Sequence, residues 1–178
     1  MSYLYRRIFK SQVTGSAVIR ELLQSMFVGE MLRAGRTAWI VSPWVNNVVL
    51  LDNRSGNFDA LNPEWGRREV RLSDVLLSLL TRGRRVVIVT RKAQSNNQFL
   101  ESFGELADQH MLAEQVEVVK RNNLHTKGIL LSNTLLLGSM NLTFTGLEIN
   151  EEWVEFSTDS EDLARARLEF ESYRVAES

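Results

Sequence analysis

Hydrophobic residues recur along the chain at two spacings, one typical of helices and the other of buried strands. Helical spacing covers residues 16–34, 73–82, 95–113 and a last segment that begins near Thr158 or Ser160. Runs rich in Val, Ile and Leu indicate buried strands. These runs cover residues 37–42, 85–90, 116–119, 125–132, 134–140 and 152–157. We therefore expect an α/β domain in which helices cover both faces of a mixed sheet, with a hairpin at Ser132-Asn133.

Some segments leave more than one interpretation open. Residues 43–69 show no clear period, and a segment of that length without regular structure is usually functional or a misassigned element. Four of its side chains could line a substrate groove or could equally be surface packing: Trp44, Asp52, Asn53 and Trp65. Ser73 is the expected N-cap of the second helix. His110 follows a stripe of apolar residues, so we interpret it as a core-boundary residue rather than a ligand.

Composition restricts the possible functions. A chain of 178 residues predicts one domain spanning residues 1–178. The absence of Cys excludes disulfides, Cys-ligated metals and a thiol nucleophile, and two His are too few for an all-His metal site. A net charge of -1 argues against binding nucleic acid by overall charge, but it allows a local basic patch. Because no signal peptide or membrane span is visible, we expect a cytoplasmic protein without membrane contact.

The most informative stretch is residues 124–152. In a strand of period two, His125 and Lys127 point to the same face, and so do Ser139 and Asn141. If the two strands pair, four polar groups converge on a Leu-rich sheet, where they would be costly to bury without partners. An anion-binding site explains this arrangement, because Lys127 supplies positive charge, Ser139 and Asn141 supply donors, and Gly138 lets the ligand approach the backbone.

These residues resemble the signature motif of the phospholipase D superfamily. That motif is His-x-Lys, a short apolar run usually containing Asp, then Gly-Ser-x-Asn and often Asn-x-Glu. It is matched here by His125-Thr126-Lys127, Gly138-Ser139-Met140-Asn141 and Asn150-Glu151-Glu152. The chain departs from the motif at the Asp position, which is Ser132. By strand parity Ser132 faces away from His125, so we expect a structural change there rather than a loss of chemistry.

The resemblance implies covalent catalysis by two histidines. In this family one His attacks phosphorus and a second protonates the leaving oxygen, with no metal and no cofactor. Because this chain has only one motif, the resemblance implies a homodimer in which two copies of His125 meet across a two-fold axis. The two copies of Lys127 and of Asn141 would hold the phosphoryl oxygens, and Glu152 would accept a hydrogen bond from the far ring nitrogen of His125. An activity optimum near the ordinary imidazole pKa, ~6.5, follows.

Nucleic acid is the substrate class that we favour from the sequence. Two basic pairs follow predicted strand ends and are candidates for gripping a phosphate backbone: Arg91-Lys92 and Lys120-Arg121. Short single-motif members of the family resemble dimeric nucleases, which suggests an endonuclease acting on DNA or RNA in restriction or phage defence. Residues 61–68 also resemble the phospholipase D-like protein of bacterial systems that place deazapurines in DNA, which implies further protein partners. A non-catalytic nucleic-acid-binding subunit and a phospholipid hydrolase remain alternatives.

Overall fold

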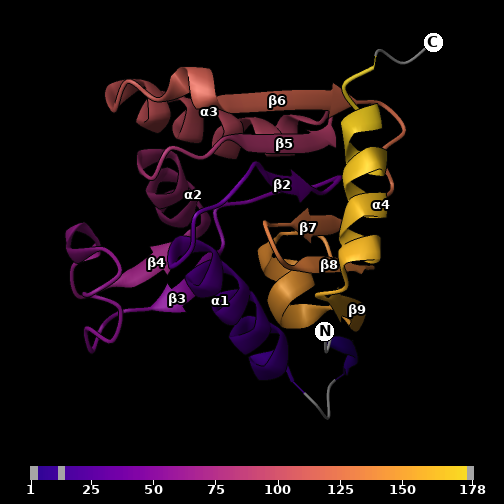
Figure 1. Ribbon diagram of the computed structural model, residues 1–178, viewed down its shortest axis with the longest axis horizontal. Helices are drawn as coiled ribbons and strands as arrows, with labels where there is room; N and C mark the ends of the chain where they lie inside the picture. Colours follow the sequence, from indigo (N-terminus) through magenta and orange to yellow (C-terminus); the bar gives the residue numbers. More distant parts are fainter. Residues whose placement is uncertain (1–3, 12–14, 176–178) are drawn as a thin grey trace.

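The computed structural model describes residues 4–11 and 15–175, and its centre is a mixed sheet (Figure 1). The strand order is β1-β9-β8-β7-β2-β5-β6, in which β2, β5 and β6 run parallel and every other neighbouring pair is antiparallel. The strands are β1 (Tyr5–Lys10), β2 (Ala38–Val41), β5 (Val86–Arg91), β6 (Val116–Arg121), β7 (Gly128–Leu130), β8 (Leu135–Gly138) and β9 (Glu152–Ser157). The predicted mixed α/β sheet is therefore confirmed.

Helices cover the two faces of the sheet unequally. Three helices pack on one face: α1 (Ala17–Met31), α2 (Leu72–Thr81) and α3 (Gln94–Gln109). The single helix α4 (Ser160–Ser172) crosses the other face (Figure 1). Each central strand is buried on both sides, because alternate side chains enter different cores. In β2, Ile40 packs beneath α1–α3 while Trp39 packs beneath α4.

The segment 43–69 has more regular structure than its sequence suggests. β3 (Val49–Asp52) and β4 (Glu69–Arg71) form a separate antiparallel pair, and a short 3-10 turn spans η1 (Pro63–Trp65). Asn53 is buried and ties the intervening loop, donating to the Asp59 carboxylate and the Gly66 carbonyl. β3 is four residues long and β4 three, too short to show a period of two, so the structure supports the interpretation that elements were missed in this segment.

Several predicted boundaries also move. β1 is a strand that the sequence analysis did not predict. α2 begins at Leu72, because the Asp74 carboxylate accepts from the Arg71 N–H at 2.8 Å and Arg71, not Ser73, is the N-cap. α3 ends at Gln109, and His110 is exposed beyond it rather than at the core boundary. Two further turns are η2 (Ala113–Gln115) and the π-helical η3 (Thr145–Ile149).

The strand directions define two opposite edges of the sheet. At the first, here called the motif edge, β2, β5 and β8 end while β7 and β9 begin. At the second, the turn edge, β2 begins, β9 ends and β7 turns into β8, with Leu131 N–H bonded to the Thr134 carbonyl at 2.9 Å. Among the residues that the structure describes, no helix has the length and apolarity needed to span a bilayer.

Candidate active site

The five predicted catalytic residues lie along the motif edge. His125 and Lys127 directly precede β7, Ser139 and Asn141 follow β8, and Glu152 opens β9. The pairing of Gly128 with Leu137 and of Gly138 with Val154 brings these three segments side by side. The predicted reason was different, because residues 125–127 do not pair as a strand and β7 is confined to Gly128–Leu130. The convergence therefore comes from three adjacent strand ends rather than from strand parity.

Arg91 holds the imidazole of His125. Its Nε donates to the Leu124 carbonyl at 2.8 Å, and its Nη2 lies 3.0 Å from His125 Nε2. A guanidinium can only donate, so Nε2 is the acceptor in this contact and the ring proton belongs on Nδ1. The guanidinium also lies over the Trp44 ring, 5.2 Å from its centroid. His125 itself is exposed, and the nitrogen that contacts Arg91 carries the lone pair that a nucleophile needs.

Glu152 has partners other than those expected. Its carboxylate accepts from the Ser139 hydroxyl and, at 3.3 Å, from Asn150 Nδ2. Ser139 Oγ in turn accepts from the Trp153 N–H at 3.0 Å. The expected bond from His125 to Glu152 is not formed, and the Glu152 carboxylate binds Ser139 and Asn150 instead. Glu152 thus fixes the Gly-Ser-x-Asn segment against β9.

Two lysines share the electrostatic field of Glu152. Lys127 Nζ donates to the His125 carbonyl at 2.6 Å, which holds the ammonium beside the imidazole. Burial lowers the pKa of Lys127, the Glu152 carboxylate opposes that change, and Arg91 adds to it. Lys10 on β1 is buried and donates to the Gly146 carbonyl at 2.7 Å, and burial lowers its pKa as well. Sequence analysis missed Lys10, because nothing near it in the chain indicates the motif.

Asn141 sits where the loop after β2 meets the motif. Val45 forms a parallel bridge with Leu142, and Asn46 N–H donates to the Leu142 carbonyl at 2.9 Å. The buried amide of Asn96 clamps this loop, accepting from Val45 N–H and donating to the Pro43 carbonyl. Asn141 Oδ1 is buried without a hydrogen-bond partner among the described residues. Such unsatisfied groups are rare and call for an explanation, of which a bound ligand is one.

Close backbone packing explains the glycine of the motif. A Cβ at Gly138 would overlap the carbonyl oxygen of Trp153 and crowd Val154 on the neighbouring strand. Only glycine lets β8 and β9 remain paired up to the point where Ser139 leaves the sheet. Glycine is required here by contact with the adjacent strand, whereas the sequence analysis assigned it to approach by a ligand.

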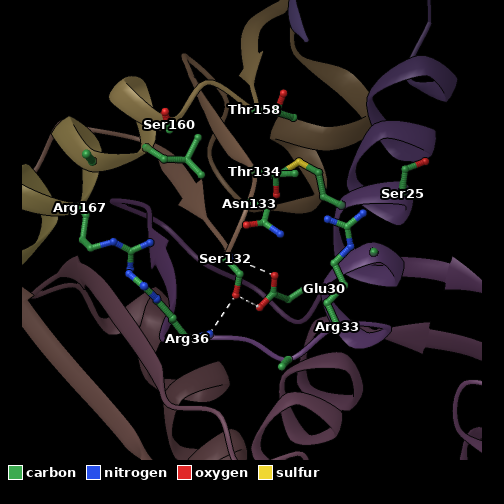
Figure 2. Close-up of a pocket in the computed structure, with 15 residues that line it drawn as sticks. Ser25, Glu30, Arg33, Arg36, Ser132, Asn133, Thr134, Thr158, Ser160 and Arg167 are labelled. Carbon is green, nitrogen blue, oxygen red and sulfur yellow. Dashed lines mark hydrogen bonds between the residues drawn. The ribbon is translucent and has the colours of Figure 1, made fainter. Parts of the chain in front are cut away.

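Ser132, which replaces the usual Asp, lies at the turn edge and not at the site. Its hydroxyl donates to Glu30 Oε1 at 2.7 Å and accepts from the Arg36 N–H at 2.9 Å (Figure 2). β7 separates it from His125. This placement agrees with the structural change that we expect at Ser132.

The remaining candidates divide between site and scaffold. Trp44 is 40% exposed beneath Arg91, whereas Trp65 is buried in the core and Asp52 pairs with Arg54 at the surface. Lys92 and Lys120 are exposed near the motif edge. Arg121 donates to the carbonyls of Tyr173 and Val175 and stacks on the Tyr173 ring, which ties β6 to the end of α4.

Comparisons with known proteins agree with this arrangement. Residues 50–174 match the family model described as "Cardiolipin synthase, PLD-like domain". The chain belongs to the phospholipase D-like family. A comparison with curated proteins finds no match. In the described part of the chain, no group of three or more His, Asp or Glu side chains is arranged to hold a metal ion.

Solved structures of this family share the fold. NucT from Helicobacter pylori superimposes with a TM-score of 0.60 at 12% identity, over 97% of this chain and 96% of that chain. Nuc from Salmonella typhimurium, a phospholipase D family member, gives 0.54 at 17% identity, over 97% and 93%. A phosphatidylserine synthase from Haemophilus influenzae gives 0.62 at 16% identity, over 94% of this chain and 37% of that chain.

Proposed function

We propose that this protein is a metal-independent phosphodiesterase that cleaves nucleic acid through a phosphohistidine intermediate. The single observation that carries the proposal is the exposed imidazole of His125, which accepts a hydrogen bond at Nε2 beside the Lys127 ammonium. A neutral ring nitrogen is the form of His that can attack phosphorus, and Nε2 frees its lone pair for the attack when Arg91 moves its N–H to the incoming phosphate. Lys127, together with Arg91, stabilises the charge that builds on the phosphoryl oxygens during that attack.

The reaction requires a second imidazole. In the first step His125 Nε2 bonds to phosphorus while the P–O bond to the leaving group breaks, and the leaving oxygen takes a proton from a protonated imidazole. In the second step a water oxygen bonds to phosphorus, the P–N bond breaks, and the water proton passes to that second imidazole. The other His of this chain, His110, lies beyond α3 and outside the site, so the acid must come from a second copy.

A homodimer across the motif edge would supply that acid. Large apolar side chains are exposed on the segments that carry the motif: Trp44, Phe144, Ile149 and Trp153, which are between 40% and 64% exposed. Exposed apolar residues gathered in this way mark contact surfaces. We call these four side chains the apolar rim. A two-fold axis through the apolar rim would bring the two copies of His125 together in one shared pocket, where one copy would be the nucleophile and the other the general acid.

Nucleic acid is the substrate that the surroundings favour. Lys92 and Lys120 are exposed basic side chains beside the site, and the Trp44 ring under Arg91 offers a stacking surface for a base. We extend the proposal to an endonuclease acting on DNA or RNA, working in restriction or phage defence together with other proteins of a DNA-modification system. The experiment below tests the chemistry first and the substrate second.

Cleavage of labelled single- and double-stranded oligonucleotides in EDTA tests the proposal directly. We expect turnover by the wild type, no turnover by His125→Ala, and unchanged turnover by His110→Ala, which removes the other imidazole of the chain. Brief reaction with 5′-labelled or 3′-labelled substrate, followed by denaturation, is expected to leave acid-labile label on the protein. Dependence on added metal, or activity in His125→Ala, would reject the mechanism.

Oligomeric state and lipid cleavage provide independent tests. Light scattering at the concentration of the activity assay is expected to give a dimer, and Ile149→Glu in the apolar rim is expected to give a monomer without turnover. An active monomer would refute the shared site. Release of headgroup from phospholipid vesicles, with no cleavage of oligonucleotides, would place the chain among lipid-processing enzymes instead.

A further inference from the structure

A second polar hollow lies at the turn edge, at the opposite end of the strands from His125. It encloses about 790 Å³ between the end of α1, the turn from β7 to β8 and the start of α4 (Figure 2). Arginine side chains and hydroxyl groups line this hollow. The charged residues that line it are Glu30, Arg33, Arg36 and Arg167, and its uncharged polar residues are Ser25, Ser132, Asn133, Thr134, Thr158 and Ser160.

The three arginines have no acidic partner. Among the described residues, no carboxylate lies within ion-pair distance of the guanidinium of Arg33, Arg36 or Arg167. Figure 2 shows the side chains of Arg36 and Arg167 pointing toward one another from different elements. Two like charges brought together repel, and an anion placed between them removes that repulsion.

The acidic residue within the hollow is already neutralised. Glu30 is buried and pairs with Arg84, whose Nε lies 3.1 Å from Glu30 Oε1. The same carboxylate accepts from the Ser132 hydroxyl and from the Ser132 N–H at 3.0 Å. The charge of Glu30 is therefore matched by Arg84, and the three arginines add three positive charges to the hollow in a chain whose net charge is -1.

Size and lining indicate the class of ligand. Pockets for small molecules usually enclose about 300–1,000 Å³ and combine apolar walls with a few polar groups. Met26, Ala34 and Leu163 supply apolar surface here, and guanidinium groups match phosphate oxygens through paired N–H donors. We propose that this arginine hollow binds the phosphate group of a nucleotide-sized ligand.

This site is separate from the proposed chemistry. Ser132 follows β7 and His125 precedes it, so the two sites sit at opposite ends of the same strand. Ligand binding at the hollow does not require the phosphodiesterase activity to exist. A variant at Lys127, the cation of the motif edge, therefore distinguishes phosphate bound at the motif edge from phosphate bound at the hollow.

Calorimetric titration of the full chain tests the proposal, with ATP, inorganic pyrophosphate and a short single-stranded oligonucleotide as probes. Arg167→Gln and Arg36→Gln are each expected to weaken ATP binding about tenfold, since each removes one charged donor. Arg165→Gln is the matched control, because Arg165 lies on the same helix, pairs with Glu161 at the surface and does not line the hollow. Lys127→Gln is expected to bind ATP like the wild type.

The contrary outcomes are distinct. No ATP binding by the folded wild type, or equal affinities for Arg167→Gln and Arg165→Gln, would overturn the proposal. Loss of ATP binding in Lys127→Gln would assign the phosphate to the motif edge. If Arg167→Gln weakened oligonucleotide binding but left ATP binding unchanged, the hollow would be a contact for a nucleic-acid backbone and not a nucleotide site.

Discussion

Replacing Arg91 with Gln removes the cation that the structure places against His125. Two hydrogen bonds depend on it, the 2.8 Å bond to the Leu124 carbonyl and the 3.0 Å bond to His125 Nε2. Gln can replace at most one of them, and it carries no charge. When Nε2 bonds to phosphorus it releases the guanidinium, which then donates to a phosphoryl oxygen. A hydrogen bond from a charged donor contributes about 1.5–3 kcal/mol, so its loss from the transition state corresponds to a drop of about 10- to 150-fold in kcat/KM.

The assay compares Arg91→Gln with two other variants on the labelled oligonucleotide. Arg91→Lys keeps the charge but lacks the planar fork, so part of the activity is expected to remain. Lys92→Gln removes one positive charge from the adjacent exposed residue and is expected to change kcat/KM much less. The ¹⁵N spectrum of the His125 imidazole is recorded in a His110→Ala background. With Arg91 present it is expected to show the ring proton on Nδ1, and in Arg91→Gln it is expected to show the two neutral tautomers in exchange.

Equal losses in Arg91→Gln and Lys92→Gln would refute this reasoning, because they would show that only the local charge matters. An unchanged ¹⁵N spectrum in Arg91→Gln would refute the tautomer argument even if activity fell. The spectrum does not depend on catalysis, so it tests the contact between Arg91 and His125 whether or not the protein cleaves nucleic acid.

Three further outcomes are expected. Burial lowers the pKa of Lys127 below the ordinary lysine value of 10.5, and the charged ammonium is lost as pH rises through that pKa. Phosphate affinity at the motif edge should therefore fall as the pH is raised, with a midpoint below 10.5. In Lys127→Arg, titrated in parallel, this fall should move to higher pH. Arg84→Ala leaves the Glu30 carboxylate buried without its cation, so denaturant unfolding should show a loss of about 3–5 kcal/mol, against about 0.5 kcal/mol or less for the exposed neighbour Arg85→Ala. Ser132→Asp places a second carboxyl group against Glu30. The melting temperature of this variant should lie further below that of the wild type at about pH 8 than at about pH 5, where the added carboxyl can bind a proton. An equal difference at the two pH values would contradict the placement of Ser132.

Local pattern in the sequence was enough for the framework of the fold. The buried runs of β2 and β5 and the amphipathic periods of α1 and α4 are visible because each depends on residues close together in the chain. The sequence analysis missed β1 and the pair β3 and β4. Which of their side chains are buried depends on strands and helices that are distant in the sequence. β1, for example, is aligned by the register that sets Lys10 opposite Glu152.

The sequence by itself determined which residues form the motif, since the order His125, Lys127, Ser139, Asn141 is legible without coordinates. Only the tertiary structure decided their partners. Arg91 reaches His125 because β5 and the segment before β7 end at the same edge of the sheet, although 34 positions separate the two residues. The arginine hollow arises in the same way from α1, the turn after β7 and α4. Contacts of this kind depend on strand order and direction, which hydrophobic periodicity does not encode.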